Sequence, residues 1–93
     1  MSEQKIERGD LCVVFWYDIE DDPNWKLLEL VELEGAPLCK TVGWFINSSD
    51  DCVRLAYSTS GTEDTKIEVG RTIIPKAVIR NIEKVRDDEL GAE

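Results

Sequence analysis

The sequence contains no histidine and no Gly-rich phosphate loop. Without histidine a Ser-His-Asp or Cys-His triad cannot form, and the general base that most enzymes use near neutral pH is absent. Two carboxylates facing each other across a cleft could still support hydrolysis, but the acidic residues fall in expected turns and on an expected exposed helix face. We therefore predict that the chain is not an enzyme, and we expect no cofactor.

Closely spaced cysteine pairs are also missing. The three cysteines, Cys12, Cys39 and Cys52, each lie alone inside an apolar run. An odd number argues against a disulfide framework, and three isolated thiols without histidine do not supply the usual zinc ligand set. We expect small buried hydrophobic residues in a reducing compartment, and no metal site.

Long hydrophobic runs are absent too. No window approaches the ~20 apolar residues of a membrane span, and the N-terminal stretch MSEQKIERGD has no apolar core of a signal peptide. We expect a cytoplasmic protein that does not contact a membrane.

Basic residues are few, and they are unevenly placed. Eleven Lys and Arg stand against 20 Asp and Glu, a net charge of −9. This balance opposes binding to a nucleic-acid backbone, because such binding depends on Lys and Arg displacing counterions. Seven acids crowd residues 18–34, and residues 71–86 are predominantly basic.

The length of 93 residues suits one small domain. We expect a disordered N-terminus at residues 1–8, a domain at 9–86 and a disordered acidic tail at 87–93. A core this small is often completed by association between chains. We therefore expect a homo-oligomer, a dimer or larger.

Several segments have the composition of strands. LCVVFWY at 11–17 is apolar on both alternating faces and predicts an interior strand. Residues 38–47 and 52–58 predict a hairpin around the turn SSDD, with Gly43 marking a bulge or bend. RTII at 71–74 predicts a fourth strand. One face of the hairpin is expected to hold Leu38, Val42, Trp44 and Ile46, and to meet Val53, Leu55 and Tyr57.

The stretch DDPNWKLLELVELEGAP predicts a helix over about residues 23–33. Asp22 can accept hydrogen bonds from the first-turn amides, Pro23 suits the first helical position, and Gly35 can end the helix in the left-handed region. Large apolar side chains at helical spacing would form a face that packs on the sheet. They are Trp25, Leu27, Leu28, Leu30 and Val31.

The segment PKAVIRNIEKV fits both a helical period and a strand. We favour one helical turn at 75–79 followed by a fifth strand to Val85, because this arrangement would close a small barrel. The predicted fold is mostly β: a five-stranded SH3-like or Sm-like barrel with one short helix after the first strand.

The string TVGWFINSSDDCVRLAYS, followed by a polar loop and RTIIPKAVIRNIEKV, resembles a class of small phage-encoded proteins of unknown function. The shared pattern is a Val-Gly-aromatic strand, an acidic turn, a strand ending in Ala and Ser, and an Ile-Pro-Lys turn before Ile-x-x-Ile. It covers about residues 11–85. The resemblance implies a shared fold, a phage origin and a host-cell cytoplasmic location, with no catalytic residue.

A more remote similarity is to SH3-like and Sm-like small barrels, which also have bent strands and a one-turn helix before the last strand. The Sm-like similarity would imply ring assembly and RNA binding. This chain departs from it in its acidic balance and in placing its helix after the first strand.

Two surfaces are candidates for binding. Acidic residues Asp21, Asp22, Glu29 and Glu32 could contact a protein partner, for example a nucleic-acid-binding protein to which clustered acids resemble phosphate. Basic residues Arg71, Lys76 and Arg80, with Trp44, could hold an anionic nucleotide-type signalling molecule between subunits, aided by free amides after Pro75. The basic residues could equally pair with acids of the same or a neighbouring chain.

These patterns predict a binding protein, most simply a phage accessory protein that sequesters or occludes a host component. The alternative is a sponge for a nucleotide-type anion. A structural role in the virion is a third possibility, for which the sequence contains no specific feature.

Overall fold

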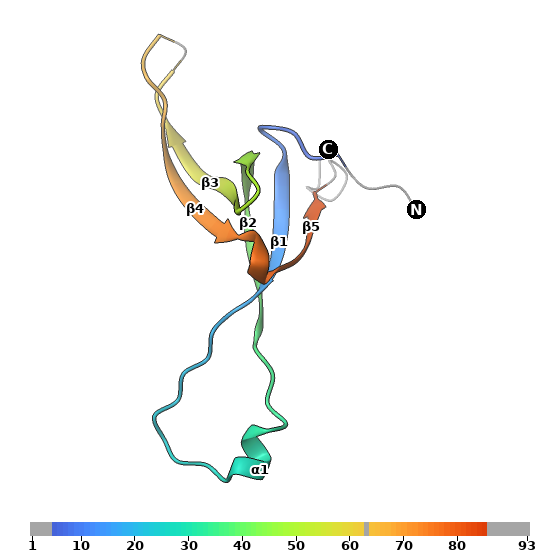
Figure 1. Cartoon of the computed structure of the whole chain (residues 1–93). Coiled ribbons are helices and arrows are strands. Elements are labelled where there is room, and N and C mark those ends of the chain that lie inside the picture. Colours follow the sequence, from blue (N-terminus) through green and yellow to red (C-terminus); the bar gives the residue numbers. More distant parts are fainter. Residues whose placement is uncertain (1–4, 63, 86–93) are drawn as a thin grey trace, which may run out of the picture.

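The structure, a computed structural model, describes residues 5–62 and 64–85. Its main element is a five-stranded antiparallel sheet with the strand order β4-β3-β2-β1-β5 (Figure 1). The mostly β fold class is therefore confirmed. The strands are β1 (Leu11–Tyr17), β2 (Leu38–Ser48), β3 (Cys52–Ser60), β4 (Glu68–Pro75) and β5 (Ile79–Lys84); the helices are α1 (Leu28–Val31) and the 3-10 turn η1 (Lys76–Val78).

The order of elements agrees with the strand predictions. β1 has the predicted bounds and lies between β2 and β5, so it is an interior strand. The β2–β3 hairpin turns at the predicted site, and η1 precedes β5 after Pro75. β4 begins at Glu68, three residues before the predicted strand, because it pairs with the extended end of β3 as far as Ser60.

The sheet is open in the described part of the chain. β4 and β5 are its two edges, and no ladder joins them. Their inward side chains still meet, because the strongly bent sheet brings Ile74 of β4 and Ile79 and Ile82 of β5 to one core. The predicted barrel remains a prediction.

The core lies on one side of this sheet. Cys12, Val14, Val53, Leu55 and Ile74 form its buried centre. Phe45 of β2 lies opposite Leu55 and packs on this centre, whereas Trp44 lies opposite Ala56 and is 45 % exposed. The side facing away from the core is called the outer face below.

The predicted inward face of the hairpin is therefore wrong for β2. Leu38, Val42 and Trp44 are exposed, and Tyr57 lies at a register shift between Ala56 and Ser58. The inward set on β2 is Cys39, Thr41, Gly43 and Phe45, with a single large apolar residue, so hydrophobic composition favoured the wrong side. A one-residue change of register moves every side chain to the other face.

The predicted short helix after the first strand is present, but it is shorter than the predicted range 23–33 and does not pack on the sheet. Only Leu28–Val31 is helical, its N-cap is Leu27 without a side-chain hydrogen bond, and every residue from 17 to 38 is exposed. Asp22 instead accepts a hydrogen bond from the Asn24 amide at 3.0 Å, and Gly35 is not left-handed. A short helix without a packing surface is marginal in water, so capping signals alone did not produce one.

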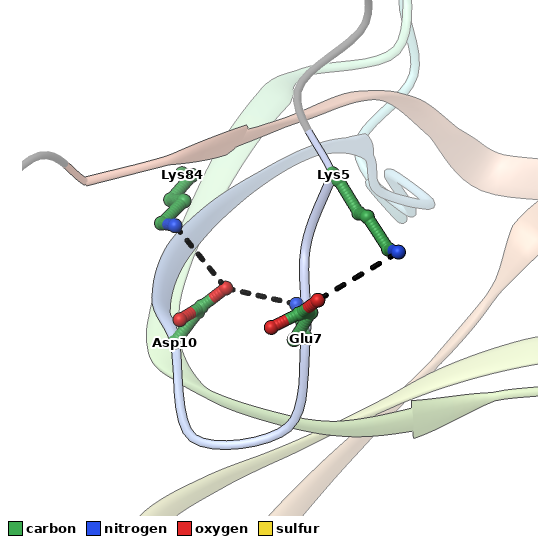
Figure 2. A network of polar contacts seen from close by, with 4 residues as sticks. All are labelled: Lys5, Glu7, Asp10 and Lys84. Atoms are coloured by element: carbon green, nitrogen blue, oxygen red, sulfur yellow. Dashed lines mark hydrogen bonds and ion pairs between the residues drawn. The ribbon is translucent and has the colours of Figure 1, made fainter.

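The chain meets the sheet before the predicted domain boundary at residue 9. Ile6 packs against the core, and the Asp10 carboxylate accepts a hydrogen bond from the Glu7 amide (2.8 Å) and pairs with Lys84 of β5 (3.5 Å), as Figure 2 shows. Lys5 pairs with Glu7 at 3.8 Å. Residues 5–8 are thus attached to the sheet. The predicted disorder at residues 1–4 and 87–93 lies outside the described residues.

Gly43 of β2 is buried against β3. A Cβ added there would lie 2.9 Å from the Ala56 carbonyl oxygen and 3.1 Å from the Leu55 Cβ. We expect Gly43→Ala to lower the free energy of unfolding by about 1–3 kcal/mol, because a backbone atom must move to admit the methyl group.

Urea unfolding of the purified protein measures this change. Gly35→Ala is the matched control, since nothing lies within 4 Å of its added Cβ. It should change stability by less than about 0.5 kcal/mol. Equal effects of the two substitutions would contradict the close approach at Gly43.

Candidate functional site

The most exposed part of the chain is a long segment between β1 and β2, residues 18–37, which we call the arm. It extends away from the sheet and carries α1 at its far end (Figure 1). At its base the Asp18 amide donates to the Pro37 carbonyl at 3.0 Å, directly after the Tyr17–Leu38 pair of the β1–β2 ladder. The arm is therefore a continuation of this hairpin.

Local polar contacts shape the arm. Asp22 forms the turn to Asn24, and Lys26 forms an ion pair and hydrogen bond with Glu34 across the loop. The hydrogen bond to Glu34 is the main cause that raises the pKa of Lys26. The negative charges of Glu34, Asp22 and Glu20 raise it further. These contacts surround an open hollow of about 550 Å³, so the arm is a loop held together at its middle.

Large apolar side chains of the arm are presented to solvent. Trp25 has an exposed fraction of 101 %, and Ile19 and Leu33 are each more than four-fifths exposed. The others are Leu27, Leu28, Leu30 and Val31. Contiguous exposed apolar side chains on a small protein mark an interaction site, because water contact with them is unfavourable.

The predicted acidic residues all lie on this arm, in two groups. Asp21 and Asp22 line the hollow, while Glu29 and Glu32 lie beside Leu27 and Leu28 around α1. With Asp18, Glu20 and Glu34 the arm has seven acids and one lysine, a net charge of −6. Among the described residues no cluster has the composition and geometry of a metal site. The arm therefore combines negative charge with exposed apolar surface.

The predicted basic group is only partly brought together. Arg71 and Trp44 lie on the outer face, each directly opposite Ala56 on β3. Ala56 is only 3 % exposed, so larger side chains on this face cover it. Arg80 lies on β5 at the opposite edge of the sheet, beside Phe15 and Leu38.

Lys76 lies in η1, and its amide donates to the Asp51 carbonyl at 2.8 Å. The expectation of free amides after Pro75 is therefore wrong at this residue. The turn packs against the β2–β3 hairpin, and the backbone N–H of Lys76 already donates to Asp51. This N–H is therefore not available to an anion.

Two features of these surfaces were missed in the sequence. One is that the apolar side chains of the arm do not pack on the sheet. The other is that the outer face combines apolar and basic residues, including Lys40 and Arg54. The alternation Leu38, Lys40, Val42, Trp44 on β2 was the available signal.

Comparison of the chain with family models, curated proteins and solved structures finds no match. Among the described residues no helix is long and apolar enough to cross a membrane. Function must therefore be argued from the arm and the outer face.

The thiols differ in accessibility, because Cys12 is fully buried whereas Cys39 and Cys52 are half-buried. Burial, with a smaller contribution from the Asp10 charge, raises the pKa of Cys12 from 9.0 to about 11. We expect an alkylating reagent at about pH 8 to modify Cys39 and Cys52 of the folded protein well before Cys12, since the thiolate is the reactive form. Peptide mapping by mass spectrometry measures the order.

The same shift predicts a pH dependence of stability. The pKa of Cys12 is higher in the folded than in the unfolded state. The contribution of the neutral Cys12 thiol to the free energy of unfolding is therefore complete below pH 9 and is lost as pH rises to about 11. Cys12→Ala should show a shallower alkaline loss of stability than the unmodified chain. Early labelling of Cys12, or identical alkaline profiles, would contradict its buried environment.

Proposed function

We propose that this chain is a non-enzymatic binding protein that recognises a protein partner through the arm. The observation that supports the proposal is that every residue from 17 to 38 is exposed, together with the composition of the arm. The partner that fits has a basic surface with apolar side chains between its charges. A nucleic-acid-binding protein has such a surface, because it is built to receive phosphate groups.

Both components of the arm would contribute to this binding. Removing an exposed Leu or Trp side chain from water stabilises a complex by about 1.5–3 kcal/mol when burial is complete. The seven acids would steer a basic partner toward the arm and set the approach rate more than the final affinity. An exposed Trp such as Trp25 is the type of residue that dominates interface energies once a partner buries it.

The setting that we propose is a phage accessory protein in the host cytoplasm that sequesters or occludes a host component. Support for the phage origin is the sequence resemblance over residues 11–85. The strand order, with the 3-10 turn before β5, is similar to that of SH3-like small barrels, and we propose that the open sheet belongs to that class. A structural role in the virion is the third candidate, which detection of the chain in purified particles would support.

The second candidate is a sponge for a nucleotide-type anion. The observation that favours it is the row formed by Trp44, Ala56 and Arg71, in which a small residue separates an aromatic ring from a guanidinium group. A planar anion could stack on Trp44 and pair with Arg71. Lys76 and Arg80 lie elsewhere on the chain, so they would join this site only through a second subunit.

The arm hypothesis is tested by removing charge from Asp21, Asp22, Glu29 and Glu32. We expect their replacement by Asn or Gln to abolish capture of the partner from bacterial lysate, because the attraction to basic residues is lost. Mass spectrometry of the captured material identifies the protein that the unmodified chain retains and the variant does not.

The matched control is the amide replacement of Asp50, Asp51, Asp64 and Glu68, which removes the same number of exposed acids outside the arm. It should retain the partner. Equal capture by both variants, or equal loss, would refute recognition by the arm.

The anion hypothesis predicts that Arg71→Ala weakens nucleotide binding by about 1–3 kcal/mol if Arg71 makes a charge-assisted hydrogen bond. Lys76→Ala should do the same only if a second subunit completes the site. Calorimetry with mono-, di- and cyclic nucleotides measures the affinity, and thermal unfolding checks the fold. No heat with any nucleotide would eliminate this candidate.

A further inference from the structure

The outer face has an unusual composition for a surface exposed to water. Its exposed apolar side chains come from β1, β2 and β4, and include Tyr17, Leu38, Val42, Trp44 and Ile73. Those of β1 and β2 are neighbours, since Tyr17 pairs with Leu38, and Val42 and Trp44 lie opposite half-buried residues of β1. Ile73 is separated from them by β3. β1 and β2 therefore carry an apolar strip on this face.

Basic residues accompany this strip. Lys40 lies opposite Phe15, Arg54 lies opposite Ile73, and Arg71 lies opposite Ala56. β2 and β3 contain no acidic residue, and the single acid of β4, Glu68, stands at its beginning. Among the described residues the acid of this face is Glu83, which lies opposite Val13 on the edge strand β5, two strands from Trp44. The outer face around Trp44 is thus apolar and positive in a chain whose net charge is −9.

The arm has the complementary composition. It is apolar and carries a net charge of −6, with Glu29 and Glu32 beside the exposed Leu27 and Leu28. The arm also extends away from its own sheet (Figure 1), so its apolar side chains do not cover the outer face of the same copy. One chain therefore presents both halves of an interface that it does not itself form.

We infer that the arm of one copy packs on the outer face of a second copy, and that two such contacts form a two-fold symmetric dimer. In a symmetric dimer each arm meets the partner's face, so every complementary contact occurs twice. A specific interface of standard size uses about 20–30 residues from each partner. The arm alone supplies 20 residues, 18–37, and the outer face adds the strip around Val42 and Trp44.

Sedimentation of the purified chain tests the dimer without any partner protein. We expect a species of about 21 kDa, twice the 10.6 kDa of one chain, at about 100 µM, and dissociation on dilution according to mass action. Raising NaCl from about 50 mM to about 500 mM should weaken the dimer, because salt screens the pairs at its edge. A single species of one chain's mass throughout this range would overturn the inference.

Charge reversal identifies the surfaces. The arm variant carries Glu29→Lys and Glu32→Lys, and the face variant carries Lys40→Glu and Arg71→Glu; all four side chains are exposed. Each variant alone places like charges at both contacts, so its self-association should weaken by about tenfold or more. Circular dichroism and thermal unfolding should show that both variants remain folded.

Mixing the two variants at equal concentration should restore a dimer. In the mixed pair the reversed arm meets the reversed face, and the unmodified arm meets the unmodified face, so both contacts regain opposite charges. A mixture that stays monomeric, or single variants that dimerise as strongly as the unmodified chain, would refute the arm-on-face contact. Both results are measured on the purified chain alone. Because the dimer covers the arm, a host partner that binds the arm would have to displace the second copy.

Discussion

The packing of Cys12, Val14, Val53, Leu55 and Ile74 on one side of a bent sheet is the constraint on which the other features depend. No α-helix of the described chain covers this core, so the sheet must curve around it. At Gly43, β2 approaches β3 so closely that no room is left for a Cβ, and the register of β2 shifts between Phe45 and Asn47. Val78 and Ile79 then complete the core from the 3-10 turn and the last strand.

Because the core is complete without it, the arm is not required for packing. Its residues are exposed, and its shape depends on the local contacts of Asp22 and of Lys26 with Glu34. A segment of this kind can change its sequence without a large effect on the stability of the sheet. Binding functions are commonly placed on such loops for the same reason.

The separation of charge follows from the same division of the chain. The core-forming strands β2 and β3 contain basic but no acidic residues, whereas the arm between β1 and β2 has seven acids. The net charge of −9 is therefore unevenly distributed, with basic residues on the outer face and most of the excess acid on the arm. Both surfaces also expose apolar side chains, which is why association, through a partner protein or a second copy, is the common element of the proposals.

The sequence by itself determined the order of the strands, the bounds of β1, the hairpin at SSDD and the turn after Pro75, because each depends on local signals within a few residues. It also placed Asp21, Asp22, Glu29 and Glu32 in one acidic segment, since they are close along the chain. Only the tertiary structure decided which side of β2 faces the core, why the predicted helix shortens to Leu28–Val31, and that Trp44 and Arg71 share a row while Arg80 does not. These features depend on register and on the presence or absence of a packing partner, which local residue patterns do not encode.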